Sequence, residues 1–331
     1  MASGHNGKIM ETALHHVVVT GAAGFIGSHM VERLLALGVR VTGIDNLSTG
    51  KINFLGGVMK HPNFIFVLRD LYMENCDDIF HGVDFVFHFS ANADVRFGVD
   101  QPRKDLEQNT IVTFNVLEAM RKNQVRKIAF SSTGSVYGEA KIFPTPEDAQ
   151  FPVQTSLYAA SKLACEGMIQ AYCEGFDFQA WIFRFVSILG ERYTHGHVID
   201  FYRKLKNNSL VLDVLGDGTQ RKSYLYIQDC ISAQLLAVQK TDDAVNIFNL
   251  GVDDYCEVKE SVAWICNELG VSPQINYAGG RNGWIGDNPF IYLDTKKISA
   301  LGWAPLLTIK NSVIRTVRYL DANQWLFEGN P

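Results

Sequence analysis

The sequence lacks several features that mark secreted, membrane-spanning and disulfide-stabilised proteins. Its 331 residues contain six cysteines, which are scattered along the chain without a Cys-x-x-Cys pair. Buried free thiols in a reducing compartment are therefore expected, and a disulfide framework or a zinc site is disfavoured. The best candidate for a membrane span, AWIFRFVSILG, is interrupted by Arg184 and is too short to cross a bilayer. We therefore expect no membrane association.

Positive charge is also scarce. Lys and Arg number 30 against 35 Asp and Glu, which gives a net charge of −5 at pH 7, and the sequence has no basic cluster of the kind that follows a phosphate backbone. Nucleic acid is therefore not an expected partner. Residues 1–13 are small and polar and lack the apolar segment of a signal peptide. We expect a flexible leader there and a cytoplasmic protein.

Short apolar runs alternate with helical patterns through the first half of the chain. The expected strands are 15–21, 39–45, 64–70, 83–91, 126–132 and 179–185, and the clearest helical patterns are 28–38, 106–123 and 156–175. This alternation predicts an α/β fold with a Rossmann-type, doubly wound parallel sheet covered by helices on both faces. After residue 187 the pattern loosens, apart from one further strand expected at 244–251. A smaller, discontinuous C-terminal lobe is expected there, against the carboxyl edge of the sheet.

Three glycines, Gly21, Gly24 and Gly27, lie between the first expected strand and the first expected helix. Glycine permits a tight turn and lets backbone amides approach a pyrophosphate at the positive end of a helix. Asp45 closes the second strand, where a carboxylate can accept hydrogen bonds from a ribose diol and repels a 2′-phosphate. The pattern thus favours NAD over NADP, with a turn-capping role for Asp45 as the alternative. Asp70 ends the third strand and is either an adenine contact or a surface residue.

The stretch FSSTGSVYG gathers Ser131, Ser132 and Thr133 at the end of an expected strand. Further along, YAASK places Tyr158 and Lys162 one helical turn apart, so both lie on one helix face. Together with the glycine turn, this grouping favours a catalytic Tyr–Lys pair over a solvated face. The proline-containing loop 141–156 is long for this topology and is expected to approach the same site.

Several motifs together resemble one protein family. They are TGAAGFIGSH, DNLSTG, HFSANADV, SSTGSVYG, YAASKLACE and GDGTQRKSYLYIQD, in order across roughly residues 16 to 320. The chain is similar to extended short-chain dehydrogenases/reductases, in the group of NAD-dependent nucleotide-sugar epimerases and dehydratases. The resemblance implies an NAD-binding Rossmann domain at 14–186, completed by the strand near 244–251. A nucleotide-sugar-binding lobe would then comprise mainly 187–243 and 252–331.

The family resemblance implies hydride exchange between a sugar and NAD, with three catalytic residues. Tyr158 would take the proton from a sugar hydroxyl, usually on C4, Lys162 would hold the ribose, and Thr133 would share the proton. One positive charge about 5 Å away is worth roughly 3 kcal/mol at an effective dielectric near 20, or about two pKa units. Lys162 and the oxidised nicotinamide together are therefore expected to lower the pKa of Tyr158 toward about 7, less the cost of burial. The implied cofactor contacts are Gly21, Gly24, Phe25, Ile26, Gly27, Asp45, Asn46, Ser48, Thr49, Gly50, Asp70, Leu71, Phe89, Ser90, Ala91, Asn109, Ser131, Tyr158 and Lys162.

Gly134 and Ser135 follow the catalytic threonine, where family members that eliminate water carry Asp-Glu. Glu139 or Glu147 could substitute, but the pattern argues against a 4,6-dehydratase. The expected reaction is C4 epimerisation through a transient 4-keto sugar, and the alternative is a net C4 dehydrogenase. A non-catalytic NAD sensor is disfavoured because Thr, Tyr and Lys are all present, and a small-alcohol oxidoreductase because of the large C-terminal lobe.

The expected nucleotide pocket departs from the family at three points. Lys222 and Ser223 stand where relatives usually have Arg and Asp, Ser187 stands in place of an amide, and Trp284 replaces an arginine for which Arg281 or Asn282 could compensate. A lysine cannot grip a phosphate bidentately. Three departures in one pocket predict an unusual sugar or base, or a differently placed diphosphate. The implied substrate contacts are Thr133, Ser187, Arg192, His197, Val198, Val214, Arg221, Lys222 and Asp287.

Two further expectations concern metal and assembly. His195 and His197 form a His-x-His pair, but the sequence offers no third ligand at a sensible spacing, so no metal site is expected. The helices 106–123 and 156–175 match those that pair across a two-fold axis in relatives. The resemblance therefore implies a homodimer that binds a nucleoside-diphosphate sugar.

Overall fold

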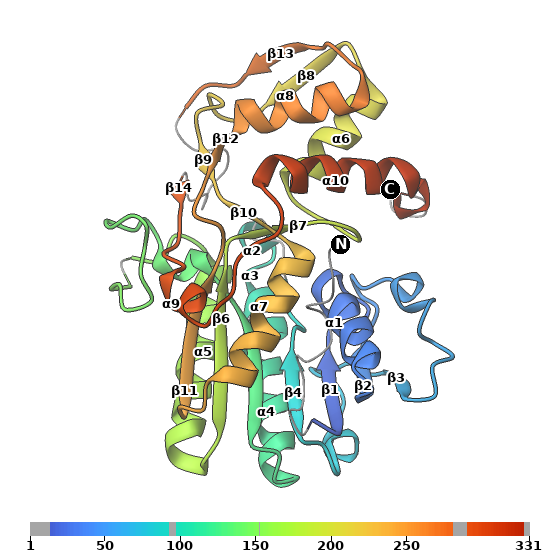
Figure 1. The fold of residues 1–331 in the computed structure, drawn as a ribbon, viewed down its shortest axis with the longest axis vertical. Helices are drawn as coiled ribbons and strands as arrows, with labels where there is room; N and C mark the ends of the chain where they lie inside the picture. The colour runs from blue at the N-terminus through green and yellow to red at the C-terminus, as the bar shows by residue number, and fades with distance from the viewer. Residues whose placement is uncertain (1–13, 93–96, 152, 281–289, 328–331) are drawn as a thin grey trace, which may run out of the picture.

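Seven parallel strands form the centre of the larger lobe (Figure 1), in the order β11-β6-β5-β4-β1-β2-β3. The computed structural model describes residues 14–92, 97–151, 153–280 and 290–327, so the predicted leader at 1–13 lies outside the described residues. The strands are β1 (His16–Thr20), β2 (Arg40–Asp45), β3 (Phe64–Leu68), β4 (Phe85–His88), β5 (Lys127–Thr133), β6 (Gln179–Phe185) and β11 (Val245–Leu250). The predicted doubly wound α/β fold is confirmed, and each expected strand overlaps an observed one, with β5 ending one residue beyond the expected range 126–132.

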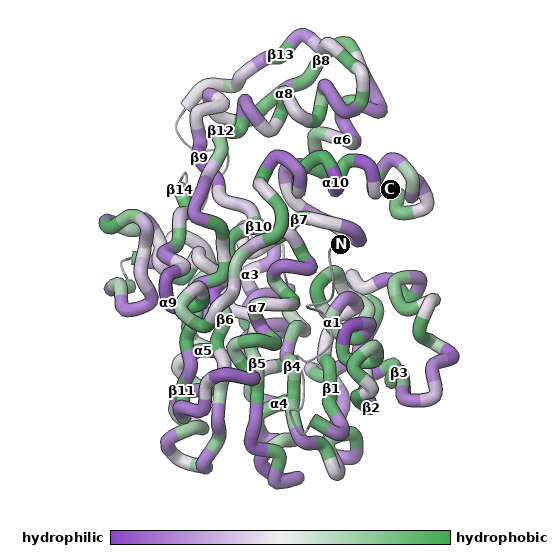
Figure 2. Tube along the Cα trace, in the orientation of Figure 1, coloured by the Kyte–Doolittle hydropathy of each residue, from purple (hydrophilic) through white to green (hydrophobic). Residues whose placement is uncertain are grey.

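Successive side chains of a strand point to opposite faces of the sheet, and helices cover both faces, so both faces are buried. Val17 and Val19 of β1 belong to the core shared with α1 (Phe25–Ala36) and α7 (Ile227–Lys240), whereas Val18 belongs to the core on the opposite face. That second core is shared with α4 (Val112–Lys122) and α5 (Leu157–Phe176). The strands accordingly run green through the hydropathy tube, and most outer connections are purple (Figure 2).

The carboxyl ends of the strands lead into irregular segments that face the smaller lobe. After β5 comes the short turn η4 (Gly134–Tyr137), and before α4 come α2 (Phe97–Asp100), α3 (Pro102–Asp105) and η3 (Leu106–Ile111). The last of these is a π-helical turn, so the helix predicted over 106–123 is not regular throughout. The short turns η1 (Ile52–Leu55) and η2 (Asp77–Phe80) follow β2 and β3.

The smaller lobe is assembled from segments that leave and rejoin the sheet. Its helices α6 (His197–Asn207), α8 (Val258–Leu269) and α10 (Ile309–Ala322) pack together above the sheet (Figure 1). Around them lie β7 (Ser187–Leu189), β8 (Val211–Val214), β9 (Arg221–Lys222), β10 (Tyr224–Tyr226), β12 (Cys256–Glu257), β13 (Gln274–Tyr277), β14 (Phe290–Ile291) and η5 (Gln324–Phe327). The short helix α9 (Lys296–Ala300) instead packs beside β11 of the large sheet (Figure 1). The precise domain boundaries proposed from the sequence stay a prediction.

Backbone hydrogen bonds connect the 141–156 loop to the segment after β14. Thr145 donates its amide to the Tyr292 carbonyl at 2.8 Å, and Asp294 donates its amide to the Thr145 carbonyl at 2.9 Å. Part of the 141–156 loop is therefore fixed against the segment that follows β14. Within the described part of the chain, no helix combines the length and apolar character needed to cross a membrane. All six cysteines are buried free thiols, as predicted.

Candidate active site

The glycine turn after β1 packs closely against both α1 and the backbone that follows β4. Gly21 has a φ of +65°, and a Cβ there would lie 2.8 Å from the Ser90 amide at the end of β4. A Cβ on Gly27 would lie 2.0 Å from the Gly21 carbonyl oxygen, which no real side chain tolerates. Both positions therefore require glycine for close backbone approach, as the sequence indicated.

The first turn of α1 is built to receive an anion. Its N-cap is Gly24, which has no side chain to cap the helix, and no acidic residue lies in the first turn. The amides of Phe25 and Ile26 belong to this turn, at the positive end of a 12-residue helix. Such an end is a ready site for a pyrophosphate. Contact of Gly24, Phe25 and Ile26 with a dinucleotide stays a prediction.

Asp45, at the end of β2, connects the glycine turn to the loop that follows. Its carboxylate accepts hydrogen bonds from the Ala23 amide at 2.9 Å and the Leu47 amide at 2.8 Å, and burial raises its pKa. A Cβ on Gly50 would lie 2.8 Å from this carboxylate, so the 46–50 loop folds closely around it. The turn-capping alternative is therefore observed, and the predicted ribose contact stays a prediction.

Asn46 and Asp70 are held together beside this loop. The side-chain nitrogen of Asn46 donates to the Asp70 carboxylate at 3.0 Å, and the side-chain oxygen of Asn46 accepts from the backbone amide of Ser48 at 3.0 Å. Asp70 also accepts from the Tyr72 amide at 2.8 Å. Among the other predicted contacts here, Leu71 is buried, whereas Ser48 and Thr49 are exposed. Asp70 is thus a fixed part of the loop cluster rather than an isolated surface residue.

A buried histidine that the sequence analysis did not single out supports the end of β4. The Thr20 hydroxyl oxygen accepts the amides of Phe89 and Ser90, both at 3.1 Å, and lies 2.7 Å from Nδ1 of His88. Because that oxygen already accepts two hydrogen bonds, its proton goes to Nδ1, and Nε2–H donates to Thr113 at 3.0 Å. Burial lowers the pKa of His88 to about 3, so the ring is neutral. These hydrogen bonds orient the backbone at Phe89 and Ser90, two of the predicted cofactor contacts.

The three predicted catalytic residues meet where β5 ends and α5 begins. The Tyr158 hydroxyl is hydrogen-bonded to the side chain of Thr133. Lys162, which is buried on the same helix, donates from Nζ to the Ser131 carbonyl at 2.8 Å and lies 4.7 Å from the centre of the Phe130 ring. The side chain of Ser156 caps α5 by accepting the Ala159 amide at 3.1 Å, which fixes the start of the helix next to Tyr158.

The protein's own groups set the two pKa values in opposite directions. Burial, with the nearby Asp105 carboxylate, raises the pKa of Tyr158 above its ordinary value, and the Thr133 hydrogen bond only partly opposes this. Burial lowers the pKa of Lys162 to about 8. The lowering of the tyrosine pKa expected from the sequence is therefore not produced by the protein alone, and the charge of a bound cofactor would have to supply it.

Asn109 occupies the π-helical turn and braces the catalytic helix. Its side-chain oxygen accepts the Asn92 amide at 2.7 Å, and its nitrogen donates to the Ser161 hydroxyl at 2.8 Å. Ser161 in turn donates to the Tyr158 carbonyl at 2.8 Å. π-Helical turns are rare and frequently lie at functional sites. Asn109 thus reaches the helix turn that carries the tyrosine.

The predicted substrate residues in the smaller lobe lie in different environments. Arg221 and Lys222 are neighbours in β9, so their side chains leave opposite faces. Arg221 is exposed, and its guanidinium lies 4.1 Å from the centre of the Phe290 ring. Lys222 is half-buried. Burial, and to a lesser extent the charge of Lys222, lowers the pKa of His197 to about 3. Lys222 is therefore the inward-facing cation of the pair.

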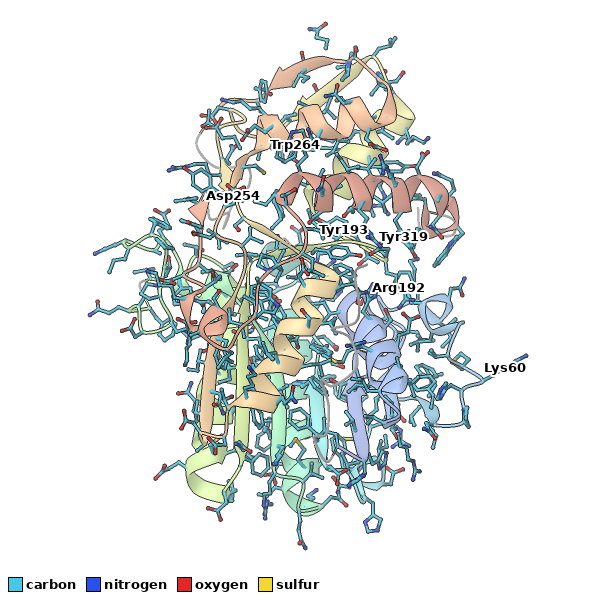
Figure 3. All side chains as sticks on the ribbon, viewed as in Figure 1. Lys60, Arg192, Tyr193, Asp254, Trp264 and Tyr319 are labelled. Atoms are coloured by element: carbon cyan, nitrogen blue, oxygen red, sulfur yellow. The ribbon has the colours of Figure 1, made fainter. Side chains whose placement is uncertain are left out.

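Two other predicted contacts are engaged within the protein. Arg192 pairs with Glu32 of α1 and is hydrogen-bonded to Tyr319 of α10, so it lies between the lobes beside Tyr193 (Figure 3). His197 bonds the Ser261 hydroxyl at 2.8 Å and lies 3.0 Å from the Tyr224 hydroxyl. Substrate contact by either stays a prediction.

The remaining predicted substrate contacts are divided between exposed, buried and undescribed positions. Ser187 is exposed, Val198 and Val214 are buried, and Asp287 lies outside the described residues, as do Arg281, Asn282 and Trp284. Within the described ranges, no three His, Cys, Asp or Glu side chains are grouped to hold a metal ion.

The glycine turn, the acid at the end of β2 and the Thr–Tyr–Lys cluster at one sheet edge are the arrangement expected of a dinucleotide-dependent enzyme. The family model described as "NAD dependent epimerase/dehydratase family" matches residues 17–251. The chain belongs to this family, and its cofactor is NAD.

Individual relatives are similar over nearly their whole length. A UDP-glucose 4-epimerase of Mycolicibacterium smegmatis is 30% identical, over 91% of this chain and 97% of that protein. The structure of a UDP-glucose 4-epimerase from Thermotoga maritima with UDP-glucose has a TM-score of 0.84 and 31% identity, covering 93% of this chain and 99% of that one. A Thermus thermophilus UDP-glucose 4-epimerase in complex with NAD has a TM-score of 0.82 and 31% identity, covering 92% and 99%.

Replacing Asp45 with asparagine is expected to reduce the preference for NAD over NADP by about tenfold. The amide cannot accept from both the Ala23 and Leu47 amides, and it no longer repels a 2′-phosphate. The ratio of the two dissociation constants, measured by calorimetry, tests this. Asp242→Asn, in the exposed loop after α7, is the control. An unchanged ratio would show that the ribose contact lies elsewhere.

Proposed function

We propose that the protein is a UDP-sugar 4-epimerase, which inverts C4 through a transient 4-keto sugar. The observation that carries the proposal is the Tyr158 hydroxyl bonded to Thr133, one helical turn from the buried Lys162. The relatives named above support it, because they are UDP-glucose 4-epimerases and one is described with UDP-glucose. The half-buried Lys222 would give the diphosphate a point charge.

The chemistry of the chain's own residues is proton transfer and orientation. Bound NAD supplies a nicotinamide that accepts and returns a hydride at C4. Thr133 donates to or accepts from the C4 oxygen and orients it, and Tyr158 as phenolate takes the C4 hydroxyl proton. Lys162 places a positive charge near that phenolate, which favours its charged form. When the keto sugar presents its other face, Tyr158 returns the proton to the C4 oxygen.

The wall beside Thr133 argues against elimination of water. A Cβ at Gly134 would lie 3.1 Å from Cγ2 of Ile291, 3.2 Å from the Phe185 carbonyl and 3.3 Å from Cδ1 of Leu293. A carboxylate side chain at this position would be crowded by these three residues, which would have to shift by a few tenths of an ångström, and it would face apolar atoms. The first of the two positions where dehydratases carry their acids is therefore unfavourable for an acid in this chain.

Glu139 and Glu147, the two acids that could replace the missing Asp-Glu pair of a dehydratase, are placed unfavourably for that role. Glu147 accepts the Asn249 amide at 2.9 Å, and burial raises its pKa. Its backbone carbonyl also accepts from Arg184 at 2.8 Å, so the residue is held within the protein. Glu139 is exposed. These placements favour epimerisation over a 4,6-dehydratase.

Proton NMR with UDP-, GDP-, CDP-, ADP- and dTDP-sugars at substoichiometric NAD tests the proposal. Many turnovers to the C4 epimer of a UDP-sugar are expected. A keto sugar formed only in proportion to the NAD added would instead identify a net C4 dehydrogenase. Inversion confined to another nucleotide would keep the reaction and correct the substrate.

We further infer a homodimer formed through α4 and α5, as in the arrangement implied by the family. Phe114 of α4 is 46% exposed, although it is a large apolar residue. Light scattering is expected to give twice the chain mass for the unmodified protein, and Phe114→Glu is expected to give a monomer because it buries a charge in the interface. Leu210→Glu, at an exposed position in the smaller lobe, is the control. A monomeric parent protein would contradict the inference.

The six buried thiols also support a reducing compartment, and we place the enzyme in the cytoplasm on that ground.

A further inference from the structure

A buried ion pair, absent from the proposed chemistry, lies beneath the catalytic residues. Nη2 of Arg184 lies 2.7 Å from Oε2 of Glu166, and its Nε lies 3.1 Å from Oε1. The two side chains are only 2% and 1% exposed. Burying two charges costs desolvation energy that their attraction barely recovers, and an apolar pair often stabilises a fold as well. Stability alone therefore gives a weak reason for this pair.

The acid of the pair is aligned with the catalytic residues on α5. Glu166 lies one helical turn after Lys162 and two turns after Tyr158, so all three side chains occupy the same helix face. Oε1 of Glu166 also accepts a hydrogen bond from the Ser132 hydroxyl. Ser132 immediately precedes Thr133 in β5. The carboxylate thus fixes the catalytic helix to the strand end that carries the threonine.

Arg184, the basic residue of the pair, holds the segment that follows Thr133. Nη1 of Arg184 donates to the Tyr137 hydroxyl at 2.7 Å and to the Glu147 carbonyl at 2.8 Å. Tyr137 is the last residue of η4, the turn that begins directly after Thr133. Its hydroxyl donates onward to Asn249 of β11 at 2.8 Å. One ion pair therefore anchors the chain both before and after Thr133.

We propose that the Glu166–Arg184 pair is a positioning element of the reaction, which holds the Thr133 hydroxyl against Tyr158 through Ser132 on one side and Tyr137 on the other. This inference rests on the proposed function. A displacement of reacting groups by about 1 Å can cost about a hundredfold in rate, so loosening either anchor lowers turnover. This proposal gives separate roles to two of the hydroxyl residues at the end of β5: Thr133 takes part in the reaction, and Ser132 holds Thr133 in place.

The anchors are better probes than the ion pair itself. Glu166→Gln would leave the Arg184 charge buried without a counter-ion, which can prevent folding. Ser132→Ala removes one hydroxyl and leaves both charges paired, and Tyr137→Phe removes one hydroxyl while Arg184 keeps the Glu147 carbonyl. Ser312→Ala is the matched control, because Ser312 of α10 is equally buried and its hydroxyl donates to the carbonyl of Thr308, the N-cap of that helix, at 2.9 Å.

Ser132→Ala and Tyr137→Phe are each expected to lower kcat about tenfold, with KM changed by less than about twofold. The double variant is expected to lose less than the product of the two, because both anchors hold the same residue. The control should keep kcat. A merely structural role would lower the melting temperature and leave kcat of the folded enzyme unchanged, which would overturn the proposal.

Crystal structures of the same variants give a readout that needs no turnover. The Thr133–Tyr158 hydrogen bond is expected to be broken or lengthened in Ser132→Ala and intact in Ser312→Ala. If the parent enzyme inverts none of the nucleotide sugars, the proposed function fails, and the position of Thr133 alone decides this inference. An unmoved Thr133 in both anchor variants would refute it.

Discussion

Replacing Tyr158 with phenylalanine is expected to lower kcat by about a thousandfold while NAD stays bound. The substitution removes only the hydroxyl that is bonded to Thr133, so the ring keeps its place on α5. Without that oxygen, the proton of the C4 hydroxyl has no base, although Lys162 and the cofactor cradle are unchanged. Turnover by NMR and the NAD content of the purified protein are the two measurements.

Tyr202→Phe is the matched control for this experiment. Its hydroxyl also makes a defined hydrogen bond, to Asp321 at 2.9 Å, but it lies on α6 of the smaller lobe. Its removal is expected to leave kcat unchanged. Retained activity in Tyr158→Phe would mean that another group takes the proton. Loss of NAD from that variant would mean that the tyrosine acts mainly in cofactor binding.

Replacing Gly27 with alanine is expected to weaken NAD binding by about tenfold to a hundredfold. The new Cβ would lie 2.0 Å from the Gly21 carbonyl, so α1 must move away from the glycine turn. Overpacking of this kind typically costs about 1–3 kcal/mol. The shift displaces the first-turn amides that we expect to meet the pyrophosphate. Calorimetric titration with NAD measures the loss.

Gly175→Ala provides the control for the glycine substitution. Gly175 lies near the end of α5, where an added Cβ meets nothing within 4 Å. Alanine there is expected to leave NAD affinity unchanged and to favour the helix slightly. If Gly27→Ala bound NAD as tightly as the parent, the glycine turn would not be the pyrophosphate site.

The central sheet could be predicted because its information is local. Most strands are short runs rich in β-branched or apolar residues, and Val17, Val18 and Val19 of β1 show why: side chains on both faces of this strand are buried. The glycine turn was equally visible, because Gly21 and Gly27 have no substitutes at their contacts. The Tyr158–Lys162 spacing follows from helix geometry alone.

Features that depend on tertiary partners were not visible. The π-helical turn around Asn109 has no sequence signature, since it depends on contacts with Asn92 and Ser161. Asp45 suited a ribose, yet its buried carboxylate is also occupied by backbone amides. Residues far apart in sequence decide such contacts.

The smaller lobe was harder to predict for the same reason. Arg221 and Lys222 differ only by one position, and the strand pairing with β12 and β14 decides which faces inward. Arg192 was assigned to the substrate from resemblance, and its observed partner is Glu32 of α1. The anchor made by Ser132 and Glu166 had one usable signal, which is that Glu166 shares a helix face with Tyr158 and Lys162.

The position of β11 has a consequence for how the chain is made. Every predicted NAD contact lies before residue 163, yet β6 gains its outer neighbour only when Val245–Leu250 has been synthesised. Until then the growing chain carries QAWIFRF as an open sheet edge, and unpaired apolar edges promote aggregation. On the ribosome, the sheet is therefore incomplete until the residues between β6 and β11 and β11 itself have been synthesised. A gene fragment ending at residue 243 would encode all of these contacts and still yield an aggregation-prone product.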